Sequence, residues 1–117
     1  MAKIVVRELI DAAKKRNASG LAANQLGFDI RVAVVRIGAR KYQSLINPQV
    51  IASMGHEQGP EECLSIPGLV VRVPRATHVV LRTSDGKQHR FQGPIARAVQ
   101  HELEHLNGVL LTDHVTI

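Results

Sequence analysis

The chain is poor in aromatic residues and in cysteine, and it has no apolar segment long enough to cross a membrane. Aromatic side chains make up 3% of its 117 residues and tryptophan is absent, so the core must be aliphatic and platforms for base stacking are nearly missing. The single cysteine excludes an internal disulfide and is typical of the reducing cytosol. No apolar run approaches the roughly 20 residues of a membrane helix. The sequence therefore predicts a cytoplasmic protein with no membrane contact and no specific nucleic-acid site.

Charge, length and periodicity predict one α+β domain spanning residues 1–117. The net charge of +5 is spread along the chain, which favours solubility more than recognition of a nucleic acid. Residues 3–16 have the spacing of an amphipathic helix, residues 17–28 and 47–67 are expected to be loops, and Gly93-Pro94 opens a second helix. Strands are expected at residues 31–37, 42–46, 76–83 and 87–91, the last two joined as a hairpin by Ser84-Asp85-Gly86.

The second helix carries a carboxylate among its apolar residues. At about 100° per residue, Glu102 falls inside the apolar arc of this helix. The arc consists of Ile95, Val99, Leu103 and Leu106, and the opposite face, expected to be solvated, consists of Arg97, Gln100, Glu104 and Asn107. A buried carboxylate is costly unless it is paired or protonated. The position of Glu102 therefore argues against an ordinary surface acid.

His101 and His105 flank Glu102 in the pattern His-Glu-x-x-His. Residues four apart share one helix face, and two imidazoles there with a glutamate between them are typical of zinc-dependent peptidases. Two ligands do not complete a metal site. One zincin pattern needs a histidine where Leu111 stands, and His114 is too near in sequence to fold back without strain. A third ligand from upstream is therefore expected.

The upstream candidates for the third ligand are His56, Cys63, His78 and His89. His78 and His89 fall in strand patterns and have no need of a further role. A lone cysteine is more often a small buried hydrophobic residue. A thiolate with two neutral imidazoles nevertheless gives an open site that keeps one position for water, which favours Cys63.

Three motifs resemble those of the peptide deformylases. The segments GLAANQLG at 20–27, EECLS at 61–65 and QHELEH at 100–105 are similar to the family patterns G-x-G-x-A-A-x-Q, E-G-C-x-S and H-E-x-x-H, in the same order. These enzymes remove the formyl group from the N-terminal methionine of new proteins. The resemblance, which extends from Gly20 to about Asp113, implies small β-sheets packed around a central metal-binding helix.

The resemblance implies a metal site and a catalytic mechanism. Cys63, His101 and His105 match the ligands of one divalent ion, with Fe²⁺ as the native metal and Zn²⁺, Ni²⁺ or Co²⁺ as ions that such a site accepts. Water activated by the metal would attack the formyl carbon, with Glu102 as general base and acid. The side chain of Gln25 and the backbone N–H of Leu64 match the groups that stabilise the oxyanion.

The implied substrate is an N-formyl-Met peptide or nascent chain. Gly20 matches the glycine whose backbone approaches the peptide, and the helical wheel places Ala98 beside His101 in the pocket for methionine. Arg97 and Glu62 are expected to give this pocket a charged rim.

The sequence departs from the family pattern at a few positions. Ala18 and Glu62 replace glycines, and Glu104, which replaces an aspartate, is expected to contact Arg75. The leading strand and the C-terminal helix of typical bacterial members have no counterpart, so ribosome proximity would not depend on that helix. A short phage-encoded form would fit these features.

Two other functions remain open. A zinc endopeptidase would cleave internal peptide bonds, and a metal-binding or ribosome-associated module derived from a deformylase would keep the metal without turnover.

Overall fold

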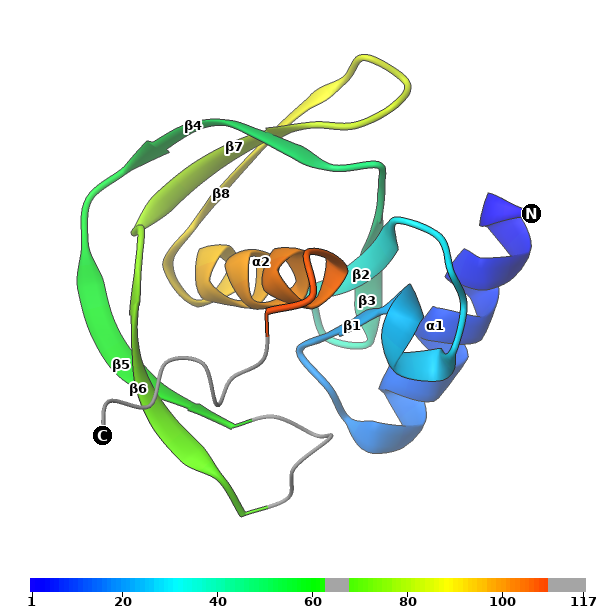
Figure 1. Ribbon diagram of the computed structural model, residues 1–117, viewed down its shortest axis with the longest axis horizontal. Coiled ribbons are helices and arrows are strands. Elements are labelled where there is room, and N and C mark those ends of the chain that lie inside the picture. The colour runs from blue at the N-terminus through cyan, green and yellow to red at the C-terminus, as the bar shows by residue number, and fades with distance from the viewer. Residues whose placement is uncertain (63–67, 110–117) are drawn as a thin grey trace.

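The computed structural model describes residues 1–62 and 68–109, with only the backbone of Glu62. Its strands follow one another between two α-helices, and this segregation confirms the α+β class (Figure 1). In chain order they are α1 (Ala2–Arg16), β1 (Gly20–Ala22), the 3₁₀ turn η1 (Ala23–Leu26), β2 (Val32–Gly38), β3 (Lys41–Ile46), β4 (Gln49–Met54), β5 (Glu57–Glu62), β6 (Val70–Arg75), β7 (His78–Arg82), β8 (Gln88–Gln92) and α2 (Gly93–Leu106).

Small antiparallel sheets surround α2, as the family resemblance implied. The strand orders are β1-β2-β3, β4-β7-β8 and β5-β6. Figure 1 shows α2 in the middle, with the β4-β7-β8 sheet above it, the β5-β6 ribbon to one side, and the β1-β2-β3 sheet with α1 on the other. α2 contacts β1, β2, β7, β8 and η1. A central helix can therefore bring together side chains from different sheets.

Aliphatic side chains form the core on both sides of the β1-β2-β3 sheet, as the composition predicted. α1 buries Val5, Leu9 and Ala13, which are spaced by four residues and pack as one stripe against that sheet. The helix ends at Asn17, whose φ of 51° is left-handed and whose N–H bonds back to the helix. α2 buries Ala96, Val99 and Leu103 in the second core cluster, which confirms the apolar arc predicted for it.

Strand pairing reveals elements that residue patterns did not predict. Residues 47–67 were expected to be loops but contain β4 and β5, and the expected loop at 17–28 contains β1 and η1. β4 is exposed at every position, so it shows no apolar alternation. β5 has the sequence EQGPEE, which is unfavourable for a strand, yet it pairs residue by residue with β6. Cross-strand hydrogen bonding therefore overrides intrinsic preference there.

The other predicted elements are confirmed to within a few residues. The predicted strands correspond to β2, β3, β7 and β8, and the predicted helices to α1 and α2. The turn of the β7–β8 hairpin contains Gly86 with a φ of 82°, where glycine is favoured. Across the two described ranges, neither helix is long and apolar enough to span a bilayer.

Candidate active site

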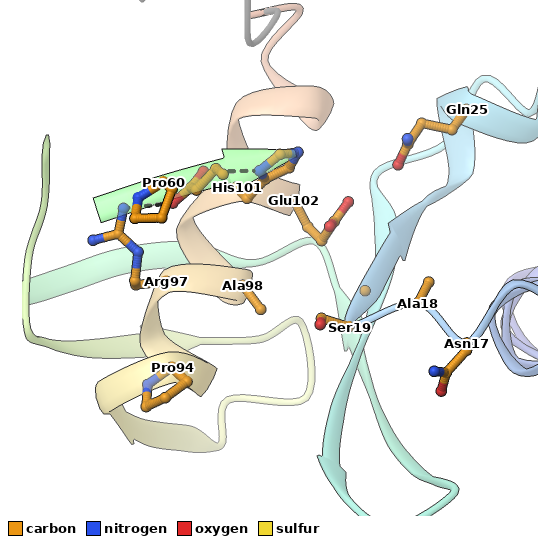
Figure 2. A pocket seen from close by; sticks show the side chains of 12 residues that line it. Asn17, Ala18, Ser19, Gln25, Pro60, Pro94, Arg97, Ala98, His101 and Glu102 are labelled. Atoms are coloured by element: carbon orange, nitrogen blue, oxygen red, sulfur yellow. Dashed lines mark hydrogen bonds and ion pairs between the residues drawn. The ribbon is translucent and has the colours of Figure 1, made fainter. Parts of the chain in front are cut away.

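A cleft of about 440 Å³ opens between α2 and β1 (Figure 2). Its walls come from the loop after α1, from β1 and η1, from the end of β5, and from α2. The residues lining it include Gly20, Gln25, Ala98, His101 and Glu102. The structure thus brings together five residues that the sequence placed in one site, although they lie in motifs more than 70 residues apart.

His101 and His105 face each other one helical turn apart. Their Nε2 atoms are 3.0 Å apart and their ring centroids 4.9 Å apart. Burial, followed by the charge of His101, lowers the pKa of His105 to about 4. His105 is therefore neutral at physiological pH, which is the state of imidazole that binds a metal.

Glu61 holds the other ring nitrogen of His101. Its Oε1 lies 2.9 Å from His101 Nδ1, so Nδ1 donates a proton to Glu61 and Nε2 is the ring nitrogen that faces His105. Arg75 binds Glu61 through two hydrogen bonds of 2.9 and 2.7 Å. Burial alone would raise the pKa of Glu61, but the hydrogen bonds from Arg75 and His101 outweigh it and lower the pKa to about 2. Glu61 is therefore an ionised carboxylate that fixes the orientation of the imidazole.

Arg75 also reaches Glu104, which confirms the predicted contact. The Arg75 Nη1–Glu104 Oε1 distance is 2.7 Å, and the exposed fractions of the two side chains are 4% and 25%. An ion pair on the surface contributes little to stability, but the Arg75–Glu104 pair is largely shielded from solvent. One guanidinium joins Glu61, beside His101, to Glu104, beside His105, and links the helix to the β5-β6 ribbon.

Replacing Arg75 with methionine should destabilise the fold by about 3 kcal/mol or more, because two carboxylates would lose their buried partner. Equilibrium urea unfolding at pH 7 measures this difference. Arg72→Met is the matched control, since Arg72 is an exposed residue of the same strand, and it should change stability by less than about 0.5 kcal/mol. Equal unfolding midpoints for the two variants would contradict a structural role for the Arg75 ion pairs.

The face of α2 that carries Arg97, Gln100 and Glu104 is not solvated as predicted. The side-chain amide of Gln100 exchanges hydrogen bonds with the N–H and carbonyl of Ala76 at 2.9 and 2.8 Å. Arg97 donates to the carbonyls of Glu57, Gly59 and Val73 and forms an ion pair with Glu61 at 3.0 Å. The unpredicted β5-β6 ribbon covers this face, so the wheel alone could not reveal its environment.

Arg97 therefore contributes less charge to the cleft than expected. It lines the cleft, but its guanidinium forms an ion pair with Glu61 at 3.0 Å and points away from Ala98 in Figure 2. Glu61, which Arg75 also binds, offsets part of its charge. Ala98 remains a small apolar surface beside His101.

Glu102 is buried as predicted, with 5% of its surface exposed. Its Oε1 has no hydrogen-bond partner in the described part of the chain. Burial is the main cause that raises its pKa to about 7. The absence of a side chain at Gly20 makes room for it, because a Cβ there would lie 2.9 Å from Glu102 Cγ and Oε2. A proton acceptor with a pKa near neutrality thus points into the cleft.

Gln25 lies across the cleft from Glu102 in Figure 2. Its Oε1 accepts a hydrogen bond of 2.9 Å from the backbone N–H of Ala22. This bond fixes the amide so that Nε2, the donor end, lies on the side away from Ala22.

Comparison with known proteins agrees with this geometry. The family model for polypeptide deformylase matches residues 2–117. The chain belongs to the peptide deformylase family. It is 45% identical over 102 residues to peptide deformylase 1 of Bacillus anthracis, covering 83% of this chain and 65% of that protein. It is 41% identical to the peptide deformylase of Dictyoglomus thermophilum, covering 95% of this chain and 74% of that protein.

Solved structures of deformylases have the same fold. The Thermus thermophilus peptide deformylase superposes with a TM-score of 0.88 at 30% identity, covering 98% of this chain and 72% of that one. A probable peptide deformylase from Synechococcus phage S-SSM7 gives 0.88 at 29% identity, covering 97% and 82%. A phage protein is thus among the structural relatives of this chain.

The third ligand predicted for the deformylase metal site, Cys63, lies outside the described residues, as does Leu64. Within residues 1–62 and 68–109, no group of three or more metal-binding side chains is assembled. The donors that are described nevertheless fit a metal, because two imidazoles converge through their Nε2 atoms and a carboxylate orients one of them. The other candidates lie elsewhere. His56 follows β4, His78 belongs to β7, and His89 of β8 contacts Gln43 and Thr83.

Sequence reasoning missed Glu61 as a site residue. It is the first residue of the EECLS motif, and it contacts His101, Arg75 and Arg97. Its position two residues before Cys63 was the available signal. Its contacts with Arg75 of β6 and Arg97 of α2 could not be inferred without knowing that β5 pairs with β6.

Proposed function

We propose that this chain removes the N-formyl group from the N-terminal methionine of newly made polypeptides. The observation that carries the proposal is Glu102, a buried carboxylate with a pKa of about 7 beside two converging imidazoles. Few functions other than proton transfer at a metal site explain a carboxylate held in this state. Membership of the peptide deformylase family supplies the substrate class.

Cys63, His101 and His105 are proposed to hold one divalent ion, because peptide deformylases are metal-dependent. Fe²⁺ is the proposed native ion, and Zn²⁺, Ni²⁺ and Co²⁺ are proposed to bind the same ligands. A bound ion supplies a Lewis acid that polarises a carbonyl and lowers the pKa of water. The Glu61–His101 hydrogen bond of 2.9 Å keeps a proton on Nδ1 and orients Nε2, the nitrogen proposed to bind the ion.

Glu102 is proposed to move the proton of the reaction. With a pKa of about 7, it can accept a proton from the attacking water and release it to the leaving amine within one cycle. The Glu102 side chain packs closely against the backbone of Gly20, which keeps its carboxylate in the cleft. Negative charge that develops on the formyl oxygen would be met by Gln25 Nε2 and the backbone N–H of Leu64.

The peptide is proposed to lie along β1. This strand is an edge of the β1-β2-β3 sheet, and Gly20, Ser19 and Ala18 line the cleft beside it. An extended peptide can add to such an edge as a further strand. Nascent chains in the cytoplasm would present the substrate, close to the ribosome.

Formate release tests the proposal. Iron-loaded protein, handled without oxygen, is incubated with formyl-Met-Ala-Ser while formate and peptide products are measured. Stoichiometric formate with Met-Ala-Ser is expected. Internal cleavage of longer peptides without formate would indicate an endopeptidase, and stoichiometric metal without any product would indicate a binding module.

The first residue of the substrate should dominate specificity, because Ala98 leaves volume beside His101 for an unbranched thioether. Replacing methionine with alanine in formyl-Met-Ala-Ser should lower kcat/KM by about tenfold or more, since roughly 1.5–3 kcal/mol of apolar burial is lost. Changes at the third residue should have effects within about threefold. A panel of formyl tripeptides measures both. Strong selectivity at position three, or indifference at position one, would contradict this pocket.

A further inference from the structure

The 3₁₀ turn that carries Gln25 is tied to the helix that carries the histidines by one side chain. Asn24 Nδ2 donates a hydrogen bond of 2.5 Å to the backbone carbonyl of His105. Asn24 and Gln25 are consecutive residues of η1. The bond therefore joins a neighbour of the proposed oxyanion donor to the backbone of a proposed metal ligand, across 81 residues of sequence.

The acceptor is a carbonyl at the end of α2. The last carbonyls of a helix have no N–H partner four residues on within the helix, and they accept hydrogen bonds from elsewhere. The His105 carbonyl also accepts one from the backbone N–H of Gly108 at 3.1 Å. A second side chain uses the same end of the helix. Arg31 donates to Leu106 O at 3.2 Å and to Asn107 Oδ1 at 3.0 Å. Arg31 lies beyond η1, in the segment before β2, so it anchors the helix without holding the turn of Gln25.

We propose that Asn24 is a positioning residue that sets the distance between Gln25 and the two histidines; this rests on the proposed deformylase function. Gln25 is held to its own turn by the Ala22 N–H, so a shift of η1 moves its amide as a unit. The Asn24–His105 bond sets where that unit lies relative to the helix. An oxyanion donor acts at about 2.7–3.1 Å from the developing charge, and a misplacement of about 1 Å can cost about 100-fold in rate.

Asn24 suits a test by mutation because it is exposed, so its replacement should leave the fold intact. Asn24→Ala removes the donor, and Asn24→Asp keeps the shape while placing an acceptor against a carbonyl. Both should lower kcat by about tenfold or more, with KM within about threefold and metal content unchanged. The side-chain amide resonances of Gln25 in ¹⁵N-labelled protein should shift in both variants. Arg31→Met is the matched control, with those resonances and kcat nearly unchanged.

A double-mutant cycle with Gln25→Ala decides whether Asn24 acts through Gln25. Formate release is measured for wild type, Asn24→Ala, Gln25→Ala and the double variant. In the Gln25→Ala background, Asn24→Ala should lower kcat by less than about twofold, because the group it positions is gone. An undiminished further loss, or a loss of metal in Asn24→Ala, would overturn the inference while leaving deformylase activity in place. No formate from wild type would overturn the proposed function and this inference with it.

Discussion

Glu102→Gln should keep the fold and the bound metal while lowering kcat by about 10²–10⁴-fold. Glutamine has nearly the same shape and fits beside Gly20, where the carboxylate now lies. It cannot accept a proton from water and return it to the amine. Formate release and elemental analysis on the same preparation separate lost chemistry from lost metal. Activity retained within a few-fold would exclude Glu102 as the general base.

The same substitution should stabilise the metal-free protein at high pH. The pKa of Glu102 is raised from 4.5 to about 7, mainly by burial, so the folded state binds its proton more tightly than the unfolded state. The stability that the neutral acid contributes is full below pH 4.5 and is lost as the pH rises through about 7. Glutamine does not titrate. The Tm difference between variant and wild type should therefore grow from pH 5 to 8, and a constant difference would contradict the burial of an unpaired acid.

Cys63→Ala, His101→Ala and His105→Ala should each abolish stoichiometric metal binding. Loss of one of three protein ligands leaves an incomplete site, and the loss of bound metal should also lower the Tm. Elemental analysis after gel filtration measures occupancy. His78→Ala and His89→Ala are matched controls, since both residues belong to the β4-β7-β8 sheet. Full occupancy in Cys63→Ala would exclude the proposed third ligand.

Side-chain periodicity was sufficient to predict the environment of Glu102 and the two histidines on α2. The apolar arc that contains Glu102 indicated its burial, and four-residue spacing put His101 beside His105. The opposite face was misjudged, because Arg97 and Gln100 are polar residues whose partners are backbone groups of β5, β6 and Ala76. A helical wheel reports which residues share a face, but it does not report what covers that face.

The β5-β6 ribbon was difficult to predict from the sequence. β5 is a strand because it pairs with β6, and its own composition does not favour a strand. A glycine and a proline lie within Glu57–Glu62, and both are disfavoured in strands. Gly59 leaves space for the side chain of Arg97, since a Cβ at this position would lie 3.2 Å from Arg97 Cζ. The ribbon therefore admits the arginine that binds its carbonyls.

Two departures from the family pattern fit the described structure. Ala18 is 4% exposed within the core cluster under α1, and it is not among the residues with a left-handed φ, so an alanine is accepted without strain. Glu104 has one methylene more than the usual aspartate and still reaches Arg75 at 2.7 Å. Both substitutions leave the cleft intact.

The ratio of kcat/KM for formyl-Met-Ala-Ser to that for acetyl-Met-Ala-Ser is the most direct measure of the central claim. The two substrates differ by one methyl group at the carbonyl carbon that is attacked, so the rest of the peptide contributes equally to binding. Iron-loaded protein should prefer the formyl peptide by about 100-fold or more, because a methyl group there hinders attack and must fit between Glu102 and Gln25. A ratio near one, with both peptides turned over, would contradict the assignment of this site to deformylation.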